Sequence, residues 1–240
     1  MITAFLWGAL GSGALLLGAL LAYELDPGPR TIGLVMALGS GLLVGSVAFE
    51  LIDDAVTSTS VAAVGGMTLV GAGVFTGGDW LLQWRGGGAR KDSRGGQADG
   101  SAMAIALGSV LDGIPESFVL GLTVKEGRVS IALLAGIVLS NLPEGMASSS
   151  GLKVAKWPTG KVVAMWTAVI VVSAISAAVG YTALGPSNAD TGGLVQAFAA
   201  GALLAMIADT MLPEAFKVEG IYTGPLVVGG FAASIILSAL

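Results

Sequence analysis

The chain has 240 residues, of which 54% are hydrophobic and only 11% are charged, with a formal net charge of −5 and a mean hydropathy of +0.86. Soluble domains carry about 25% charged residues, so this composition excludes an ordinary soluble protein and indicates a polytopic protein of the lipid bilayer. Cysteine and histidine are absent, which excludes disulfides, thiolate sites and imidazole ligands, and no basic or aromatic tract indicates nucleic-acid binding.

Apolar runs long enough to cross a membrane recur along the chain. A helical span needs about 20 mainly apolar residues, and turns rich in proline and glycine separate such runs. We expect eight spans, at 1–23, 32–55, 61–84, 101–124, 129–152, 161–184, 192–215 and 221–240. The sequence therefore predicts an all-α, polytopic membrane protein with eight transmembrane helices.

One long polar segment divides these runs. Residues 85–100 read RGGGARKDSRGGQADG, and their glycine and charge content predicts a flexible loop that cannot be buried. The loop separates three spans in residues 1–84 from five in residues 101–240. We expect one membrane domain overall.

The basic residues predict an orientation, because connections on the cytoplasmic side are enriched in Lys and Arg. With the N-terminus outside, only Lys125 and Arg128 would fall in outer connections. The other nine of the 11 basic residues would be cytoplasmic: Arg30, Arg85, Arg90, Lys91, Arg94, Lys153, Lys156, Lys161 and Lys217. We therefore expect a protein of the cell membrane with both termini extracytoplasmic and the 85–100 loop in the cytoplasm.

The fourth and fifth spans each carry a Pro-Glu step and a polar residue four positions before its glutamate. The pairs are Asp112 with Glu116 and Ser140 with Glu144, and Asn141 follows Ser140. Residues i and i+4 share a helix face. Because ionisable residues at membrane depth are costly, they mark ion or substrate pathways. The pattern predicts a cation site with oxygen ligands between these two spans.

The prolines of the two steps are expected to interrupt their helices. Pro115 and Pro143 each lack an N–H and displace the carbonyl four residues earlier, those of Leu111 and Leu139. Interrupted helices are tolerated at membrane depth where they line a cavity. The alternative interpretation is that each Pro-Glu step begins a helix after a loop.

Two further spans contain acids that predict a pathway through the membrane. The second ends in FELIDDA, with Glu50, Asp53 and Asp54 towards the outer side, where a simple helix end is an alternative interpretation. The seventh contains Asp209 well inside the span and Glu214 nearer the cytoplasm. An outer acidic mouth, a central site and an inner acidic exit would form a relay.

These segments resemble the ZIP (Zrt-, Irt-like protein) family of divalent metal transporters. The resemblance covers nearly the whole chain and rests on the eight spans, the variable loop after the third, the paired Pro-Glu steps and the acids of the second and seventh spans. It implies a 3+2+3 arrangement of the spans, extracellular termini and a metal site on the fourth and fifth spans.

Carried over residue by residue, Glu116, Asn141 and Glu144 match the motif residues of the family. Asp112 stands at a histidine position and Ser140 at a His or Gln position, so the chain looks like a histidine-free variant. The resemblance implies one metal site made of these residues, with Ser140 as a lesser ligand.

The ligand chemistry bears on the choice of metal. Gly113 stands where the family has an asparagine. The resemblance implies that this asparagine is a ligand of a second metal, so we do not expect a two-metal centre in this chain. The resemblance implies zinc or iron as the substrate, whereas carboxylate and carbonyl oxygens favour a harder cation such as manganese. No organic cofactor is expected.

Three functions remain open at this point. The first is a divalent metal transporter, and not an enzyme, that takes the ion into the cytoplasm. The second is a ZIP-like membrane protein that binds a cation without transporting it. The third is an intramembrane aspartyl protease using Asp79 and Asp112, which would have to approach within a few ångströms. The resemblance also allows a homodimer.

Overall fold

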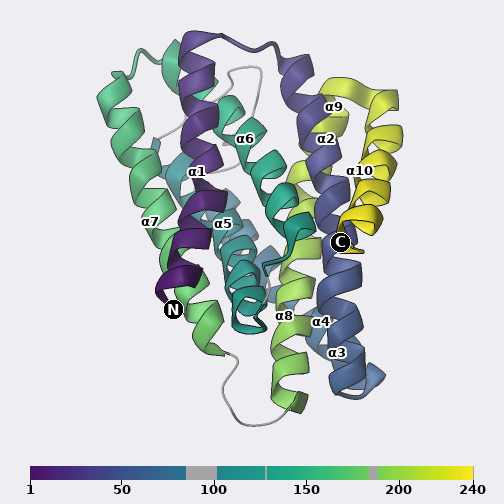
Figure 1. Ribbon diagram of the computed structural model, residues 1–240. Coiled ribbons are helices and arrows are strands. Elements are labelled where there is room, and N and C mark those ends of the chain that lie inside the picture. Colours follow the sequence, from purple (N-terminus) through teal and green to yellow (C-terminus); the bar gives the residue numbers. More distant parts are fainter. Residues whose placement is uncertain (85–101, 128, 184–188, 240) are drawn as a thin grey trace.

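The computed structural model describes residues 1–84, 102–127, 129–183 and 189–239, and these fold into a bundle of helices (Figure 1). The predicted loop at 85–100 lies outside the described residues. The helices, in chain order, are α1 Ile2–Glu24, α2 Pro29–Ser46, η1 Val47–Ile52, α3 Asp53–Ser58, α4 Val61–Leu82, α5 Ala102–Lys125, α6 Ile131–Val154, α7 Thr159–Ala183, α8 Ala189–Met206, η4 Ile207–Met211, α9 Leu212–Glu219, η5 Gly220–Tyr222 and α10 Thr223–Ser238.

Eight helices in the described residues are long and apolar enough to cross a membrane. The predicted all-α class and the eight apolar spans are therefore confirmed, with ends that move by a few residues. The second span is longer than predicted, because α2, η1 and α3 join into one rod, Pro29–Ser58. The seventh is longer for the same reason, since α8, η4 and α9 form Asp190–Val218. The chain has the architecture of a multi-pass membrane protein.

The prediction that the prolines interrupt their spans is wrong. α5 continues through Pro115 and α6 continues through Pro143. A proline removes only one N–H from the helical ladder, and within a packed bundle neighbouring helices can support the carbonyl that it frees. Here Gly39 of α2 lies so close to Leu139 that a Cβ on it would be 2.8 Å from the Leu139 carbonyl oxygen.

The departures from α-helical geometry occur instead in the second and seventh spans. η1 and η4 are π-helical segments, and each contains one acid of the predicted pathway, Glu50 and Asp209 respectively. A π-helical turn shifts the positions of the side chains that follow it, and such turns are frequent at functional sites. In the seventh span Pro213 follows η4 directly and lacks the N–H that would bond the Asp209 carbonyl, which accounts for the distortion there. The second span has no proline in or directly after η1.

Glycine allows the helices to pack with their backbones in contact. The most extensive helix pairs are α1 with α6, α5 with α7, α2 with α10, and α4 with α8. Between α1 and α6 the fit is reciprocal, because a side chain at Gly18 would collide with the Leu142 carbonyl and one at Gly145 with the Leu15 carbonyl. Small residues at helix contacts are the usual means of close packing in lipid.

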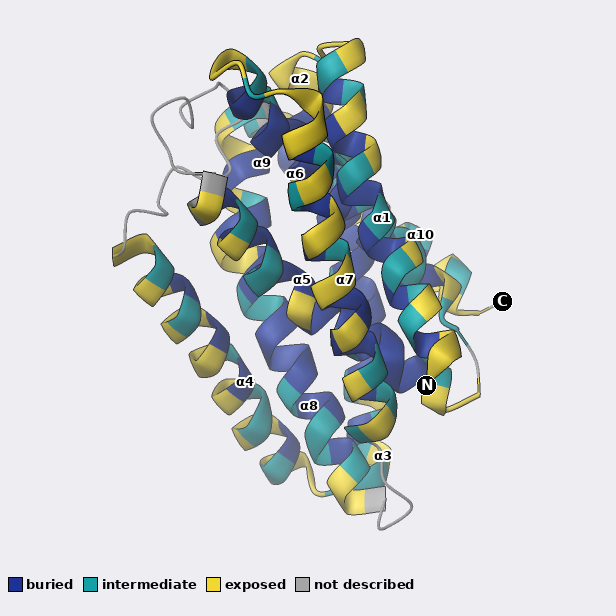
Figure 2. Ribbon diagram, turned by 90° about the vertical axis from the view of Figure 1, so that its left-hand side faces the viewer, coloured by how far each residue is buried: buried dark blue, intermediate teal, exposed yellow. Residues whose placement is uncertain are grey.

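The central helices of the bundle are α2, α5, α6 and α8. The apolar windows of α5 and α6 are each 67% buried, whereas those of α4 and α10 are each only 17% buried. Figure 2 shows α4 at the edge of the bundle, with exposed residues along its length and the mostly buried α8 and α5 beside it. The polar motifs of α5 and α6 therefore lie in the interior, while α4 and α10 present apolar side chains outwards.

The turns at one end of the bundle are joined by polar contacts. Lys153 Nζ lies 3.4 Å from Asp26 Oδ1, and Tyr23 Oη donates a hydrogen bond of 3.0 Å to the Trp157 carbonyl. These contacts bring the α1–α2 and α6–α7 turns together at the top of Figure 1. We call this the basic end, because the helix ends and turns there contain Arg30, Lys153, Lys156, Lys161 and Lys217. The α3–α4 and α5–α6 turns lie at the opposite end. We call this the acidic end, because Asp53, Asp54 and Glu126 lie there.

Candidate metal site

α5 carries two carboxylates in the interior of the bundle. Asp112 and Glu116 are each only 2% exposed, although they lie near the middle of a helix whose flanks are apolar. Their spacing of four residues places them on one face, as the sequence predicts. Two acids at this depth require compensation from neighbouring polar groups or from a bound cation.

The neighbouring helix α6 supplies the other three predicted residues, and all of them are buried. They are Ser140, Asn141 and Glu144. These side chains offer hydroxyl, amide and carboxylate oxygens, which together with the acids of α5 form an all-oxygen donor set. Such donors can hold a divalent cation without any imidazole.

One direct contact joins the two helices at this level. Ser140 Oγ donates a hydrogen bond to Glu116 Oε1 across 3.0 Å. The same hydroxyl lies 2.9 Å from the Ile137 carbonyl of its own helix, and its single proton serves one acceptor at a time. Ser140 is therefore placed to orient the Glu116 carboxylate.

The structure does not gather all five residues into one cluster. Asn141 Nδ2 donates to the Gly11 carbonyl of α1, across 3.3 Å, so its amide is engaged on the α1 side of α6. Within the described ranges, no three acidic side chains lie close enough to hold a metal ion together. One contact between the predicted ligands is the hydrogen bond of Ser140 with Glu116.

The space beside Gly113 is occupied by the sixth span. A Cβ on Gly113 would lie 2.7 Å from Ser173 Oγ of α7, and this fully buried hydroxyl has no hydrogen-bond partner among the described residues. One turn further along α7, Ser176 Oγ donates to the Ile114 carbonyl across 2.9 Å. The α7 face next to the site therefore carries hydroxyls and no carboxylate.

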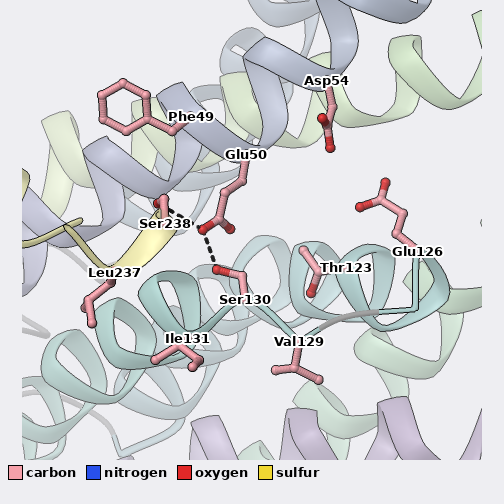
Figure 3. Close-up of a pocket in the computed structure, with 10 residues that line it drawn as sticks. All are labelled: Phe49, Glu50, Asp54, Thr123, Glu126, Val129, Ser130, Ile131, Leu237 and Ser238. Atoms are coloured by element: carbon pink, nitrogen blue, oxygen red, sulfur yellow. Dashed lines mark hydrogen bonds between the residues drawn. The ribbon is translucent and has the colours of Figure 1, made fainter. Parts of the chain in front are cut away.

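A second polar feature is a pocket of about 270 Å³ at the acidic end (Figure 3). Glu50 and Asp54 line it from the second span, and Glu126 lines it from the α5–α6 turn. In Figure 3 the carboxylates of Asp54 and Glu126 point towards each other across the pocket. The structure thus brings two predicted pathway acids together and adds a third.

Hydroxyl groups hold the Glu50 carboxylate in this pocket. Ser130 Oγ donates a hydrogen bond to Glu50 Oε1, and Ser238 Oγ donates to the same oxygen across 3.3 Å. Asp53, in contrast, is exposed and does not line the pocket. The two adjacent aspartates that were predicted together therefore differ in position, because Asp54 lines the pocket and Asp53 does not.

Sequence reasoning missed Glu126 and Ser130. Glu126 follows the apolar run of the fourth span and Ser130 stands at the start of the predicted fifth span, where polar residues are usual, so neither carried a signal by itself. They join the pocket because the α5–α6 turn lies beside η1. Glu126 Oε1 also accepts a hydrogen bond of 2.6 Å from Gln196 Nε2 of α8, which ties this turn to the seventh span.

The two acids predicted for the inner pathway occupy different environments. Asp209 of η4 is exposed, and its Oδ2 accepts a hydrogen bond of 2.9 Å from Thr76 Oγ1 of α4. Glu214 of α9 is buried. Nearby on α4, Asp79 is only 3% exposed and accepts a hydrogen bond of 2.5 Å from Gln83. The third span therefore contributes polar groups next to Asp209 that the predicted pathway did not include.

The chain matches none of the protein-family models against which it was scanned, and no curated protein matches it either.

Proposed function

We propose that this protein transports a divalent metal cation across the cell membrane. The observation that carries the proposal is the burial of three carboxylates, Asp112, Glu116 and Glu144, at the middle of two adjacent apolar helices. A purely structural role does not require three buried acids in these helices. A cation that passes along them would be stabilised by one or two of these carboxylates at a time, because no three acidic side chains of the described residues lie close enough to hold it together.

The ZIP-like arrangement is part of this proposal. Suppose that each of the first three spans is exchanged with its counterpart among the last three (α1 with α7, α2 with α8 and α4 with α10), and that α5 is exchanged with α6. The contact of α1 with α6 then corresponds to that of α7 with α5, and the contact of α2 with α10 corresponds to that of α8 with α4. The exchange also converts η1 into η4. This repeated pairing supports a 3+2+3 fold, since transporters built from inverted repeats place their substrate site at the repeat interface.

The site residues would have distinct roles. Glu116 and Glu144 would bind the cation directly, and Asp112 would supply the charge that replaces an imidazole. Ser140 would orient Glu116 through the hydrogen bond of 3.0 Å. Asn141 would have to leave the Gly11 carbonyl to become a ligand. The all-oxygen set leaves zinc, iron and manganese as substrates, with manganese favoured by its preference for carboxylate ligands.

The acids elsewhere would form the two halves of the pathway. At the acidic end, Glu50, Asp54 and Glu126 line the pocket and would concentrate cations at the outer mouth. Asp209 and Glu214 would receive the ion on the way to the basic end. With that end in the cytoplasm, as the positive-inside rule favours, a negative membrane potential drives the cation inwards.

Metal flux into proteoliposomes tests the proposal. The native protein should move Mn²⁺, Zn²⁺ or Fe²⁺, and Glu116→Gln and Glu144→Gln should each reduce the flux to background. Glu24→Gln is the matched control, because Glu24 is exposed at the end of α1, and its flux should equal that of the native protein. Native flux that persists in both site variants would refute the assignment.

The alternative of a cation-binding protein gives a different result in the same preparation. Equilibrium binding of Mn²⁺ that is lost in Glu144→Gln, together with no flux by the folded native protein, would favour binding without transport. Absence of both binding and flux would leave the buried acids without a cation role.

A further inference from the structure

A second cavity, of about 300 Å³, lies between α4, α5 and α8 on the side of the bundle seen in Figure 2. Every residue that lines it is apolar, and the larger ones are Val74 and Phe75 of α4, Leu111, Ile114 and Phe118 of α5, and Phe198 of α8. No carboxylate, hydroxyl or amide side chain lines this space. The cavity is therefore unlike the acidic pocket and does not belong to the proposed ion pathway.

The cavity lies at membrane depth and reaches the lipid-facing surface. Ile114 is near the middle of α5, and Phe198 and Ala202 are near the middle of the seventh span. Two lining residues are strongly exposed, Val74 at 59% and Ile114 at 42%. The cavity is thus continuous with the apolar surface that the eight spans present to the hydrocarbon core of the bilayer.

It is energetically unfavourable for such a space either to hold water or to remain empty. An ordered water needs two to four polar partners, and apolar cavities of about 150 Å³ stay dry and accept apolar ligands. An empty void of twice that size would deprive its lining of dispersion contacts. Since lipid hydrocarbon borders the opening, we propose that the acyl chain of a bilayer phospholipid inserts between α4, α5 and α8.

The opposite side of the bundle shows why this space is distinctive. Under the exchange of spans described above, the contact of α2 with α6 corresponds to that of α8 with α5. α2 and α6 are in close contact, because Gly39 lies against the Leu139 backbone and a Cβ on Gly136 would be 2.9 Å from Leu43 Cδ2. Between α8 and α5, Phe118, Phe198 and the cavity intervene. The acyl chain would substitute there for the helix contact.

The inserted chain would lie against the helix that carries the buried acids. Leu111, Ile114 and Pro115 line the cavity, whereas Asp112 and Glu116 each follow a lining residue and lie on the neighbouring face of α5, about 100° around the helix. The ligand class is a long-chain acyl tail, and the carboxylates do not line its binding site.

Photocrosslinking tests the site without relying on metal flux. Native protein would be reconstituted in liposomes containing a phospholipid with a diazirine at the middle of one acyl chain, irradiated without metal, and mapped by peptide mass spectrometry. We expect crosslinks to Phe75 and Ala199, which are buried but line the cavity, as well as to exposed Val172 and Val179 of α7. Crosslinks to the exposed valines alone, with none at Phe75 or Ala199, would overturn the proposal.

A variant that fills the cavity provides the second measurement. Ala202→Phe places an aromatic ring in the cavity lining, and crosslinks at Phe75 should fall to background while those at Val172 remain. Ala168→Phe is the matched control, because Ala168 is exposed on α7, and it should leave the Phe75 crosslinks unchanged. Undiminished Phe75 crosslinks in folded Ala202→Phe protein would also overturn the proposal, and if this variant does not fold, the map of the native protein decides.

Discussion

Ser140 of α6 donates a hydrogen bond of 3.0 Å to the Glu116 carboxylate of α5, where both residues are buried. This bond is a direct polar link between the two motifs of the proposed metal site. A hydroxyl that holds one oxygen of a carboxylate limits its rotation, so the other oxygen keeps a fixed direction. In the proposed site, the bond would orient Glu116 towards a cation without contributing charge.

Ser140→Ala should weaken metal binding while preserving the transport step. A hydrogen bond to a charged group contributes about 1.5–3 kcal/mol, so the metal concentration for half-maximal flux should rise by roughly ten- to a hundredfold, since about 1.4 kcal/mol corresponds to tenfold. Ser150→Ala is the control, because the Ser150 hydroxyl donates to the Met146 carbonyl of its own helix and to no other group in the described part of the chain. Equal behaviour of the two variants in concentration-dependent flux assays would contradict a positioning role for Ser140.

Glu50→Gln should affect capture of the ion more than its passage. Glu50 lines the pocket at the acidic end and is held by Ser130 and Ser238, whereas Asp53 is exposed outside the lining. Removing the pocket charge should raise the half-saturating metal concentration several-fold, most strongly at low ionic strength, with little change in maximal flux. Asp53→Asn should resemble the native protein, and an effect as large as that of Glu50→Gln would show that general surface charge, not the pocket, is responsible.

The apolar runs predicted the eight helices because a segment in lipid must make its backbone hydrogen bonds within itself. The predicted helix ends were less accurate, since a helix can continue beyond the apolar run from which it is predicted. The second span continues through Asp53 and Asp54 to Ser58, and the Thr57 and Ser58 hydroxyls bond the Asp54 carbonyl in its last turn. A helix that leaves the bilayer remains a helix, although its composition becomes polar.

The candidate site was predictable in part. Spacing along one helix placed Asp112 with Glu116, because i and i+4 positions share a face of an α-helix. The same spacing pairs Glu50 with Asp54, and both line the acidic pocket although Glu50 lies in a π-helical segment. Contacts between helices were not predictable in this way, since they depend on how the helices cross. The partnership of Asn141 with Gly11 and that of Glu126 with Gln196 both arise from such crossings, and so does the position of Thr76 beside Asp209.

Gly18→Ala should destabilise the bundle far more than the same change at Gly13. A Cβ at Gly18 would collide with the Leu142 carbonyl and lie 3.0 Å from the Met146 nitrogen, whereas one at Gly13 meets nothing within 4 Å. Separating the α1 and α6 backbones should cost about 1–3 kcal/mol, and alanine at Gly13 should gain up to about 1 kcal/mol of helix propensity. Thermal unfolding in detergent measures both, and comparable unfolding temperatures for the two variants would contradict the backbone contact.

Single-cysteine labelling should place the basic end in the cytoplasm. The chain contains no cysteine, so each introduced thiol is the only target. Ala155 is exposed in the α6–α7 turn at the basic end, and Val61 is exposed at the opposite end where α4 begins. Each Lys or Arg near the anionic inner surface contributes about 1 kcal/mol to its retention there. A membrane-impermeant maleimide should therefore label Val61→Cys in intact cells and Ala155→Cys only after permeabilisation. The reverse labelling pattern would show the opposite orientation in the membrane. The acidic pocket would then face the cytoplasm and receive the ion at the end of its passage.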